Sequence, residues 1–336
     1  MTPKVLLSGF ADEGAVRKTA LEQMTMLAAV GLKHYSLRFV DVGNGVKNVM
    51  QLTDDEIKTL QQFHSDFGVS VATIGSPVGK VKIKDVDDGT KNRYVPFRQY
   101  VDHDVRHAIM LAHAFGTKLI RGFSFYPPKG ERPEDYVRQA GDMIGEIAAR
   151  CEEAGVIFGL EVEANLVGQN GHLMMELYKH VNSKALVLVF DAANLLVQLG
   201  SGKAVVENYH AMKAGIAWMH IKDYHQKGKI QWRGHVDEAM LKNFAPCDEG
   251  DCNHPAILKD FAKRIPALDR KLKKLGVPGV FLDLEPHLKG GGQFGGASGP
   301  DGFGVALRAL TSVLDSARIA YDLRSYKDIE AIKRAV

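Results

Sequence analysis

The chain has 336 residues, of which 45% are hydrophobic and 25% are charged, and its formal net charge is only +3. This composition is typical of a globular protein that buries a large core without disulfides or structural metals. The near-neutral charge and the lack of a block of Lys or Arg argue against a nucleic-acid-binding function.

Short apolar runs alternate with amphipathic helical stretches along the whole chain. We expect strands at 4–8, 34–39, 69–74, 118–125, 156–163, 185–191, 217–222 and 280–285. Helices are expected between them, at 16–29, 54–67, 100–114, 134–154, 173–181, 205–214, 257–275 and 303–317. This order is typical of βα units with a parallel sheet, and eight such units close a TIM barrel. We therefore predict one (β/α)₈ TIM barrel domain over 1–336.

The alternative fold is an open, doubly wound sheet. It ranks below the barrel because no Gly-x-Gly-x-x-Gly pattern follows the first strand, where residues 8–14 read SGFADEG. The longest connections follow strands, at 41–53, 76–96, 223–254 and 288–302. In a barrel such loops lie on the catalytic face, so they predict a substrate site or a partner surface there.

Four consecutive strands of the second half end in a charged or titratable residue after an apolar run. These residues are Glu161, Asp191, His220 and Glu285. A charge at the end of a buried strand is costly without a partner, and three carboxylates at one barrel mouth would repel one another. A cation resolves the conflict, and an oxygen-rich set with one nitrogen suits Mn²⁺ first, or Mg²⁺. The competing interpretation is that each group has a private hydrogen bond, as polar strand ends often do.

Strand alternation places a second set of side chains above this quartet. Lys222 lies two residues beyond His220, His287 two beyond Glu285, and Glu163 two beyond Glu161. These residue types transfer protons and neutralise oxyanions, so they are the candidate catalytic residues. A surface salt bridge of Lys222 with Asp223, and a turn at His287, are the structural alternatives. Because Glu161 and Glu163 point the same way, the choice of ligand on the fifth strand stays open, with Glu161 favoured.

Four further residues are candidates for substrate binding: Arg38, Arg121, Asn194 and Trp232. Trp232 could stack on a sugar or aromatic ring, or could pack its loop down. Cys247, Cys252 and His254 lie close together in the same loop, but their spacing is not that of a standard zinc site and no fourth ligand is evident. We therefore interpret them as two cysteines in a polar loop. The Gly-rich segment 290–299 is expected to be a lid or a partner contact.

Several motifs resemble the xylose isomerase-like superfamily, also called sugar phosphate isomerase/epimerase. They are Leu160-Glu161, 190–194 (FDAAN), 220–223 (HIKD) and 284–288 (LEPHL). The resemblance covers nearly the whole chain and implies that Glu161, Asp191, His220 and Glu285 ligate one metal ion. Such a metal grips a ketone and an adjacent hydroxyl, which acidifies the proton between them. Isomerisation, epimerisation and elimination all begin with the loss of that proton.

A narrower resemblance rests on 8–13 (SGFADE), 36–39 (SLRF), 45–50 (GVKNVM) and 160–168 (LEVEANLVG). These segments are similar to the large subunit of bacterial C-glycoside deglycosidases. The resemblance implies a lyase that cleaves the carbon–carbon bond between a 3-oxo sugar and an aromatic aglycone, after Glu163 or His287 removes the C2 proton. It also implies a small β subunit that covers the barrel mouth.

Three other functions compete with the lyase. A ketose isomerase or epimerase is the main alternative, although epimerases of the superfamily tend to carry His where this chain has Asn194. A DNA-repair endonuclease would need extra His ligands and a basic groove. A non-catalytic barrel is disfavoured by the complete ligand set.

The cysteines and the chain start suggest a cellular location. Three cysteines are too few and odd in number for a disulfide framework, which fits a reducing cytoplasm. The apolar run at 5–7 is too short for a signal peptide, and no apolar run reaches the roughly 18 residues of a membrane span. We expect a cytoplasmic protein without membrane contact.

Overall fold

The structure is a computed structural model that describes residues 2–228, 242–292 and 295–335. Eight parallel strands form one sheet in the order β1-β12-β9-β8-β7-β6-β5-β2. Their bounds are Leu6–Gly9 (β1), His34–Leu37 (β2), Ser70–Val78 (β5), Leu119–Gly122 (β6), Ile157–Glu161 (β7), Leu186–Asp191 (β8), Ile216–Ile221 (β9) and Phe281–Leu284 (β12). A parallel bridge between Phe10 and Ser36 links the ends of β1 and β2, so the sheet is a nearly closed barrel. The predicted TIM barrel is thus confirmed, with strands shorter than expected at several ends.

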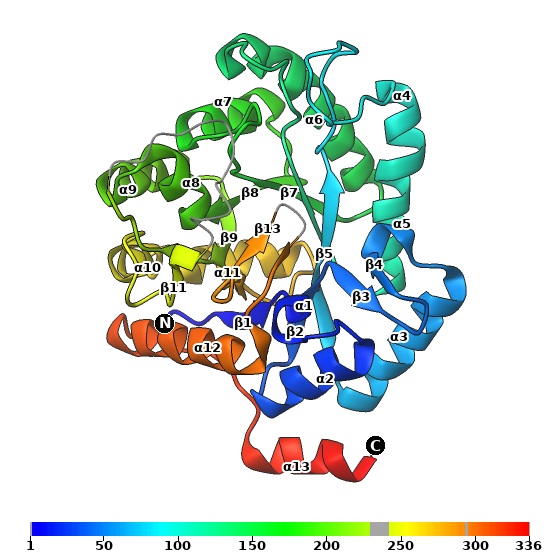
Figure 1. Ribbon diagram of the computed structural model, residues 1–336, viewed down its shortest axis with the longest axis vertical. Helices are drawn as coiled ribbons and strands as arrows, with labels where there is room; N and C mark the ends of the chain where they lie inside the picture. Colours follow the sequence, from blue (N-terminus) through cyan, green and yellow to red (C-terminus); the bar gives the residue numbers. More distant parts are fainter. Residues whose placement is uncertain (1, 229–241, 293–294, 336) are drawn as a thin grey trace.

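Helices surround the strands, as the ring of coiled ribbons in Figure 1 shows. They are α1 (Ala11–Gly14), α2 (Ala20–Ala29), α3 (Asp54–Phe67), α4 (Phe97–Tyr100), α5 (Arg106–Ala114), α6 (Val137–Glu153), α7 (Gly171–Val181), α8 (Ala192–Leu199), α9 (Gly202–Met212), α10 (His254–Phe261), α11 (Ile265–Lys274), α12 (Gly299–Ser316) and α13 (Tyr326–Ala335). Among the described residues, no helix is both long and apolar enough to span a membrane.

The helix α3 shows how local sequence sets an element's ends. Thr53 and Glu56 form a capping box at its start, since each side chain accepts a hydrogen bond from the backbone N–H of the other residue. Gly68 closes the helix at φ +58°, a left-handed conformation that glycine adopts without steric cost. Both signals are visible in the sequence, and the predicted range 54–67 agrees with the structure.

Four of the predicted helices differ in the structure. The helix expected at 257–275 is two helices, α10 and α11, because Pro266 in the first turn of α11 has no N–H to continue a helix from before it. The helix expected at 16–29 begins only at Ala20, after Thr19 caps it. A turn of π-helix, Val101–Val105, separates α4 from α5, and a 3₁₀ turn, Pro133–Tyr136, precedes α6. Neither α8 nor α13 was expected.

Three antiparallel hairpins occupy the loops beyond the carboxyl ends of β2, β9 and β12. They pair β3 (Phe39–Asp41) with β4 (Val46–Asn48), β10 (Asp223–Tyr224) with β11 (Phe244–Ala245), and β13 (Gly291–Gly292) with β14 (Gly295–Gly296). The long loops therefore build structure around the mouth where the predicted site residues lie.

Candidate metal centre

The four predicted ligands come together at the carboxyl ends of β7, β8, β9 and β12. One ligand atom from each of Glu161, Asp191, His220 and Glu285 lies within 4.8 Å of the others, and all four side chains are buried. Glu161 and Asp191 are the last residues of β7 and β8, and neighbouring parallel strands place them at the same edge. Asp191 is also the N-cap of α8, where it accepts a hydrogen bond from the Asn194 backbone N–H.

His220 is the centre of this group. Its Nδ1 lies 3.2 Å from Glu161 Oε1, 3.5 Å from Glu285 Oε2 and 3.9 Å from Asp191 Oδ2. The ring packs edge-on against Phe10, with centroids 5.2 Å apart. One nitrogen therefore faces three carboxylates while the ring is held from the side, an arrangement that suits a metal ligand.

Lys222 projects into the same group. Its Nζ lies 2.9 Å from Asp191 Oδ2 and 3.1 Å from Glu285 Oε2. Lys222 is buried, so the alternative of a surface salt bridge with Asp223 is wrong. The Lys222 side chain points inward because residues two apart on a strand lie on the same face, and His220 points into the barrel mouth.

The charges of the group shift the proton affinities of its members. Burial would lower the pKa of His220, but the carboxylates of Glu161 and Glu285 raise it to about 10. Burial would raise the pKa of Glu161, but His220 and Arg121 lower it to about 2. Burial and the neighbouring carboxylates raise the pKa of Asp191 despite Lys222. Without a metal, protons on His220 and Lys222 thus supply the positive charge that balances the carboxylates.

The residues fit a divalent cation. Glu161 Oε2 is buried and has no hydrogen-bond partner among the described residues. Ligands held at about 2.1 Å from one ion are separated from each other by roughly 3 to 3.5 Å, close to the distances around His220 Nδ1. Three carboxylates and one imidazole form the donor set of a hard or borderline cation, not of a thiophilic one.

Glu163, the alternative ligand on the fifth strand, lies outside this group. It forms an ion pair with Lys80, whose Nζ is 2.8 Å from Glu163 Oε2, and both side chains are about a quarter exposed. The strand β7 ends at Glu161, so the alternation that would carry Glu163 to the same side stops there. The geometry therefore favours Glu161 as the ligand.

His287 lies beside the quartet and pairs with a residue that the sequence did not single out. Its Nδ1 lies 3.0 Å from Glu13 Oε1, and its backbone N–H donates to Glu13 Oε2. One ligand atom from each of Glu13, His287 and Glu285 also lies within 4.8 Å of the others. Burial would raise the pKa of Glu13, but His287 and Arg38 lower it to about 2.

Arg38 joins the two groups. It donates to Glu285 Oε1 at 2.6 Å, to Glu13 Oε1 at 3.0 Å and to Asp12 Oδ2 at 3.1 Å. Each of its donor nitrogens faces a protein carboxylate, and its guanidinium carbon lies 4.2 Å from the Phe10 ring centroid. These contacts position Glu285, while the role in substrate binding stays a prediction.

The other predicted substrate contacts lie at different distances from the metal group. Arg121 lies 3.5 Å from Glu161 Oε2, and the Asn194 side-chain amide donates to Glu161 Oε1 at 3.2 Å. Both side chains therefore contact a candidate ligand. Trp232 lies outside the described residues.

Comparisons with known proteins address the fold. The sequence profile of the family described as "Xylose isomerase-like TIM barrel" matches residues 25–286. The chain belongs to this xylose isomerase-like family. No protein of curated function matches the chain.

Solved structures share the xylose isomerase-like barrel at low sequence identity. The probable 3-DHS dehydratase AsbF of Bacillus anthracis is 15% identical, with a TM-score of 0.61 over 92% of this chain and 98% of that one. A xylose isomerase-like TIM barrel protein from Mycobacterium smegmatis, in complex with magnesium, is 17% identical, with a TM-score of 0.60 over 94% and 98%. D-psicose 3-epimerase of Clostridium cellulolyticum H10 is 13% identical, with a TM-score of 0.55 over 94% and 98%. At these identities the likeness shows the fold.

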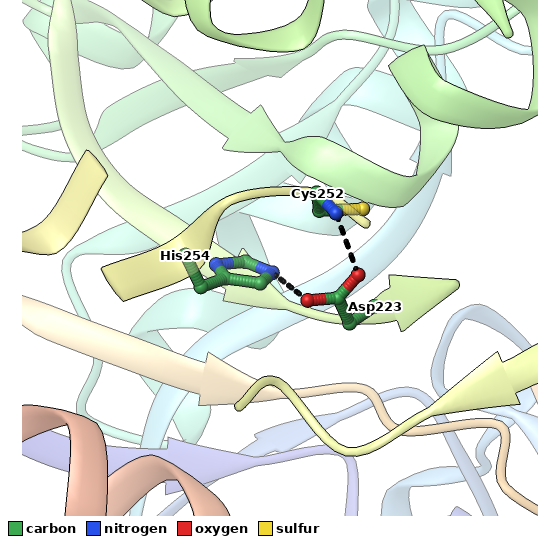
Figure 2. Close-up of side chains that lie close together, drawn as sticks. All are labelled: Asp223, Cys252 and His254. Carbon is green, nitrogen blue, oxygen red and sulfur yellow. Dashed lines mark hydrogen bonds and ion pairs between the residues drawn. The ribbon is translucent and has the colours of Figure 1, made fainter. Parts of the chain in front are cut away.

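A second group of donor side chains in this xylose isomerase-like barrel was not expected. Asp223, Cys252 and His254 lie together beyond the end of β9 (Figure 2), and all three are buried. Cys247 and Cys252 are free and buried, so the loop does not expose them to solvent as the interpretation of two cysteines in a polar loop implied. Sequence reasoning missed Asp223 because about 30 residues separate it from the cysteine cluster, and only the β10–β11 hairpin reunites them.

Proposed function

We propose that this chain is the metal-binding subunit of a lyase that cleaves the carbon–carbon bond of 3-oxo-C-glycosides. The observation that carries the proposal is the buried quartet of Glu161, Asp191, His220 and Glu285, which shares Glu285 with the Glu13–His287 pair. A ligand set and an acid–base pair side by side are what proton abstraction next to a ketone requires.

The quartet would hold one divalent cation, with Mn²⁺ as the first candidate and Mg²⁺ as the second. When bound, the cation supplies Lewis acidity to the ketone oxygen at C3 and the hydroxyl at C2, which acidifies the C2 proton. Arg38 orients the Glu285 carboxylate by donating a 2.6 Å hydrogen bond to it. Asn194 holds Glu161 through a hydrogen bond, and Arg121 lies 3.5 Å from Glu161 Oε2 as an ion pair.

His287 is the better of the two candidates for the base. It is 7% exposed and lies beside Glu13, whereas Glu163 is engaged by Lys80. A carboxylate next to an imidazole nitrogen fixes the ring and stabilises the imidazolium that forms when the other nitrogen takes a proton. Glu13 is therefore a positioning residue, and His287 is the group that takes the proton from C2.

The reaction then balances within the sugar. The C2–H electron pair forms the C1–C2 double bond as the bond from C1 to the aromatic ring breaks. The ring carbon gains a proton, and a 3-oxo glycal remains. Lys222, which lies among Asp191 and Glu285, is placed to neutralise negative charge that develops on the sugar oxygens.

The segments that resemble C-glycoside deglycosidases support this function by their location. Segment 8–13 contains Asp12 and Glu13, and segment 36–39 contains Arg38, which binds both of them. Segment 160–168 contains Glu161. Three of the four segments therefore supply residues to the metal group or to its immediate neighbours.

The lyase proposal includes a small β subunit that covers the barrel mouth. The described strands of the β3–β4, β10–β11 and β13–β14 hairpins follow the carboxyl ends of β2, β9 and β12, and the small subunit would dock against this end of the barrel. Hetero-oligomer formation would exclude water from the site, which strengthens its electrostatic interactions.

The test uses the purified chain with Mn²⁺, alone and with the candidate β subunit, and a 3-oxo-C-glucoside as substrate. Aglycone release is measured by chromatography, with metal-depleted protein and Glu285→Gln as controls. We expect release that requires the metal and is lost in Glu285→Gln. The same samples are incubated with a free ketose to score epimerisation.

One outcome would overturn the lyase proposal, and another would overturn the assignment of Glu285. Absence of released aglycone in both arms contradicts it, and epimerisation of the ketose in those samples favours the alternative, a metal-dependent ketose isomerase or epimerase. Aglycone release that survives in Glu285→Gln would contradict the assignment of Glu285.

A further inference from the structure

The group of Asp223, Cys252 and His254 combines three kinds of donor in one buried place. One ligand atom from each lies within 4.8 Å of the others, and the exposed fractions are 1%, 0% and 0%. Figure 2 shows the three side chains converging from β10, from the turn before α10 and from the first residue of α10. Asp223 directly follows Lys222 in the chain, but none of the three residues belongs to the quartet.

The Asp223 carboxylate lacks a cation within the described part of the chain. Its Oδ1 accepts hydrogen bonds from the backbone N–H groups of Tyr224 and Cys252, at 2.7 and 2.9 Å. Its Oδ2 has no hydrogen-bond partner, and the imidazole Nε2 of His254 lies 4.0 Å away. Lys222 does not pair with Asp223, because the Lys222 ammonium forms its ion pairs with Asp191 and Glu285. A buried carboxylate with one unpaired oxygen is costly unless a cation binds there.

The loop around Asp223 is packed closely against it. A Cβ on Gly250 would lie 2.1 Å from Asp223 Oδ1, so only glycine fits at this position. His254 Nε2 donates a hydrogen bond to the Lys222 carbonyl oxygen at 3.0 Å, which fixes the ring beside Asp223 and Cys252; a metal on this nitrogen would replace that hydrogen bond. The fold thus holds the donors in a fixed arrangement instead of leaving them on a free loop.

We propose that Asp223, Cys252 and His254 form a second metal site, of the zinc type, distinct from the catalytic quartet. A thiolate, an imidazole and a carboxylate are the ligands that Zn²⁺ selects in proteins, and the Lys222 carbonyl or a water would complete a tetrahedral set. Zn²⁺ binding breaks the Cys252 S–H bond, forms a zinc–sulfur bond and releases that proton to solvent, while the proton on His254 Nε2 is lost to solvent and Nδ1 takes one up, so that Nε2 can bind the ion. The ion neutralises the thiolate and the Asp223 carboxylate together.

This site would join the end of β9 to the start of α10. Asp223 follows Lys222 directly, and His254 contacts the Lys222 backbone, so the ion would fix the backbone from which Lys222 reaches the quartet. Its role would be to position Lys222 and not to take part in the reaction.

A sulfur ligand distinguishes the two sites experimentally, because only the second site contains a cysteine. Full-length protein is depleted of metal and reloaded with Co²⁺, and its near-ultraviolet spectrum is recorded. A thiolate–Co²⁺ charge-transfer band is expected in the wild type and in Glu285→Gln, and it is expected to vanish in Cys252→Ser. Cys151→Ser is the matched control, since Cys151 is also a buried free cysteine but lies on α6. Metal analysis should show one equivalent lost in Cys252→Ser and a different one lost in Glu285→Gln.

The proposal is overturned if wild-type protein loaded with Co²⁺ shows no such band, or if the band persists in Cys252→Ser. The wild-type spectrum decides the matter even if Cys252→Ser does not fold. A plain hydrogen-bonded turn around Asp223 would give the first of these results. Neither result depends on the sugar substrate, so failure here leaves the lyase proposal untouched.

Discussion

The ammonium of Lys222 lies 2.9 Å from Asp191 Oδ2 and also contacts Glu285, so it is the cation that the carboxylates of the quartet share in the absence of a metal. Two of the four predicted ligands are therefore engaged by a residue that the sequence assigned to catalysis. A metal ion that binds all four must draw these carboxylates away from Lys222.

Replacing Lys222 by Met should tighten metal binding. The change removes a positive charge next to the site, so we expect the affinity for Mn²⁺ to rise by about tenfold or more, while turnover falls. The metal-free variant should lose stability, because Asp191 Oδ2 and Glu285 Oε2 lose the buried ammonium that they share. Competition with a chelator measures the affinity, and thermal unfolding with and without Mn²⁺ measures the stability.

Lys80→Met is the matched control for this variant, because Lys80 pairs with Glu163 outside the quartet. It should leave the Mn²⁺ affinity unchanged. Weaker binding in Lys222→Met would show that Lys222 supports the metal instead of competing with it.

Metal binding should become tighter as the pH rises. The pKa of His220 is raised to about 10, so at neutral pH its nitrogen carries a proton that a metal must displace. The apparent affinity should rise by up to about tenfold per pH unit until the pH approaches that pKa. Calorimetric titrations in buffers of different ionisation enthalpy should detect about one released proton. An affinity that is flat between pH 6.5 and 8.5, with no proton release, would contradict this charge assignment.

Replacing Glu13 by Gln should slow the reaction without removing the metal. The variant keeps the size of the side chain but loses the carboxylate beside His287 Nδ1, so kcat should fall by on the order of a hundredfold. Glu163→Gln should have the smaller effect on kcat. The reverse order would assign the base to Glu163.

Much of the barrel could be predicted from the sequence because strands and helices carry local signals. Alternating apolar runs located all eight strands, and the quartet emerged because Glu161, Asp191 and Glu285 are charges at the ends of buried strands. Glu13 carries no such signal. It follows β1 within the short helix α1, and only closure of the barrel brings it to His287, which follows β12 at the other end of the chain.

The neighbours of Asp223 were missed for a similar reason. The sequence placed Cys252 and His254 near each other in a polar loop, and their burial depends on how that loop folds back on β9. A surface ion pair of Lys222 with Asp223 stayed open as the alternative to a catalytic Lys222, because a sequence cannot show which face of the barrel end is open. Tertiary contacts between distant segments decide these points.

Arg38 should contribute more to stability than any surface arginine. It is 5% exposed and pairs with Asp12, Glu13 and Glu285, so Arg38→Met removes one buried cation that three buried carboxylates share. We expect a loss of about 3–5 kcal/mol in the free energy of unfolding, measured by urea denaturation. Arg132→Met is the comparison, since its pair with Asp135 lies on the surface and is screened by solvent, so its loss of stability should be much smaller. Equal losses in the two variants would contradict the role of Arg38.

The most direct test of the metal centre is anomalous X-ray scattering from crystals of the protein soaked in Mn²⁺. We predict a manganese peak within ligand distance of Glu161, Asp191, His220 and Glu285, with the Lys222 ammonium displaced from Asp191. Manganese that binds elsewhere, while Lys222 still bridges Asp191 and Glu285, would contradict the account.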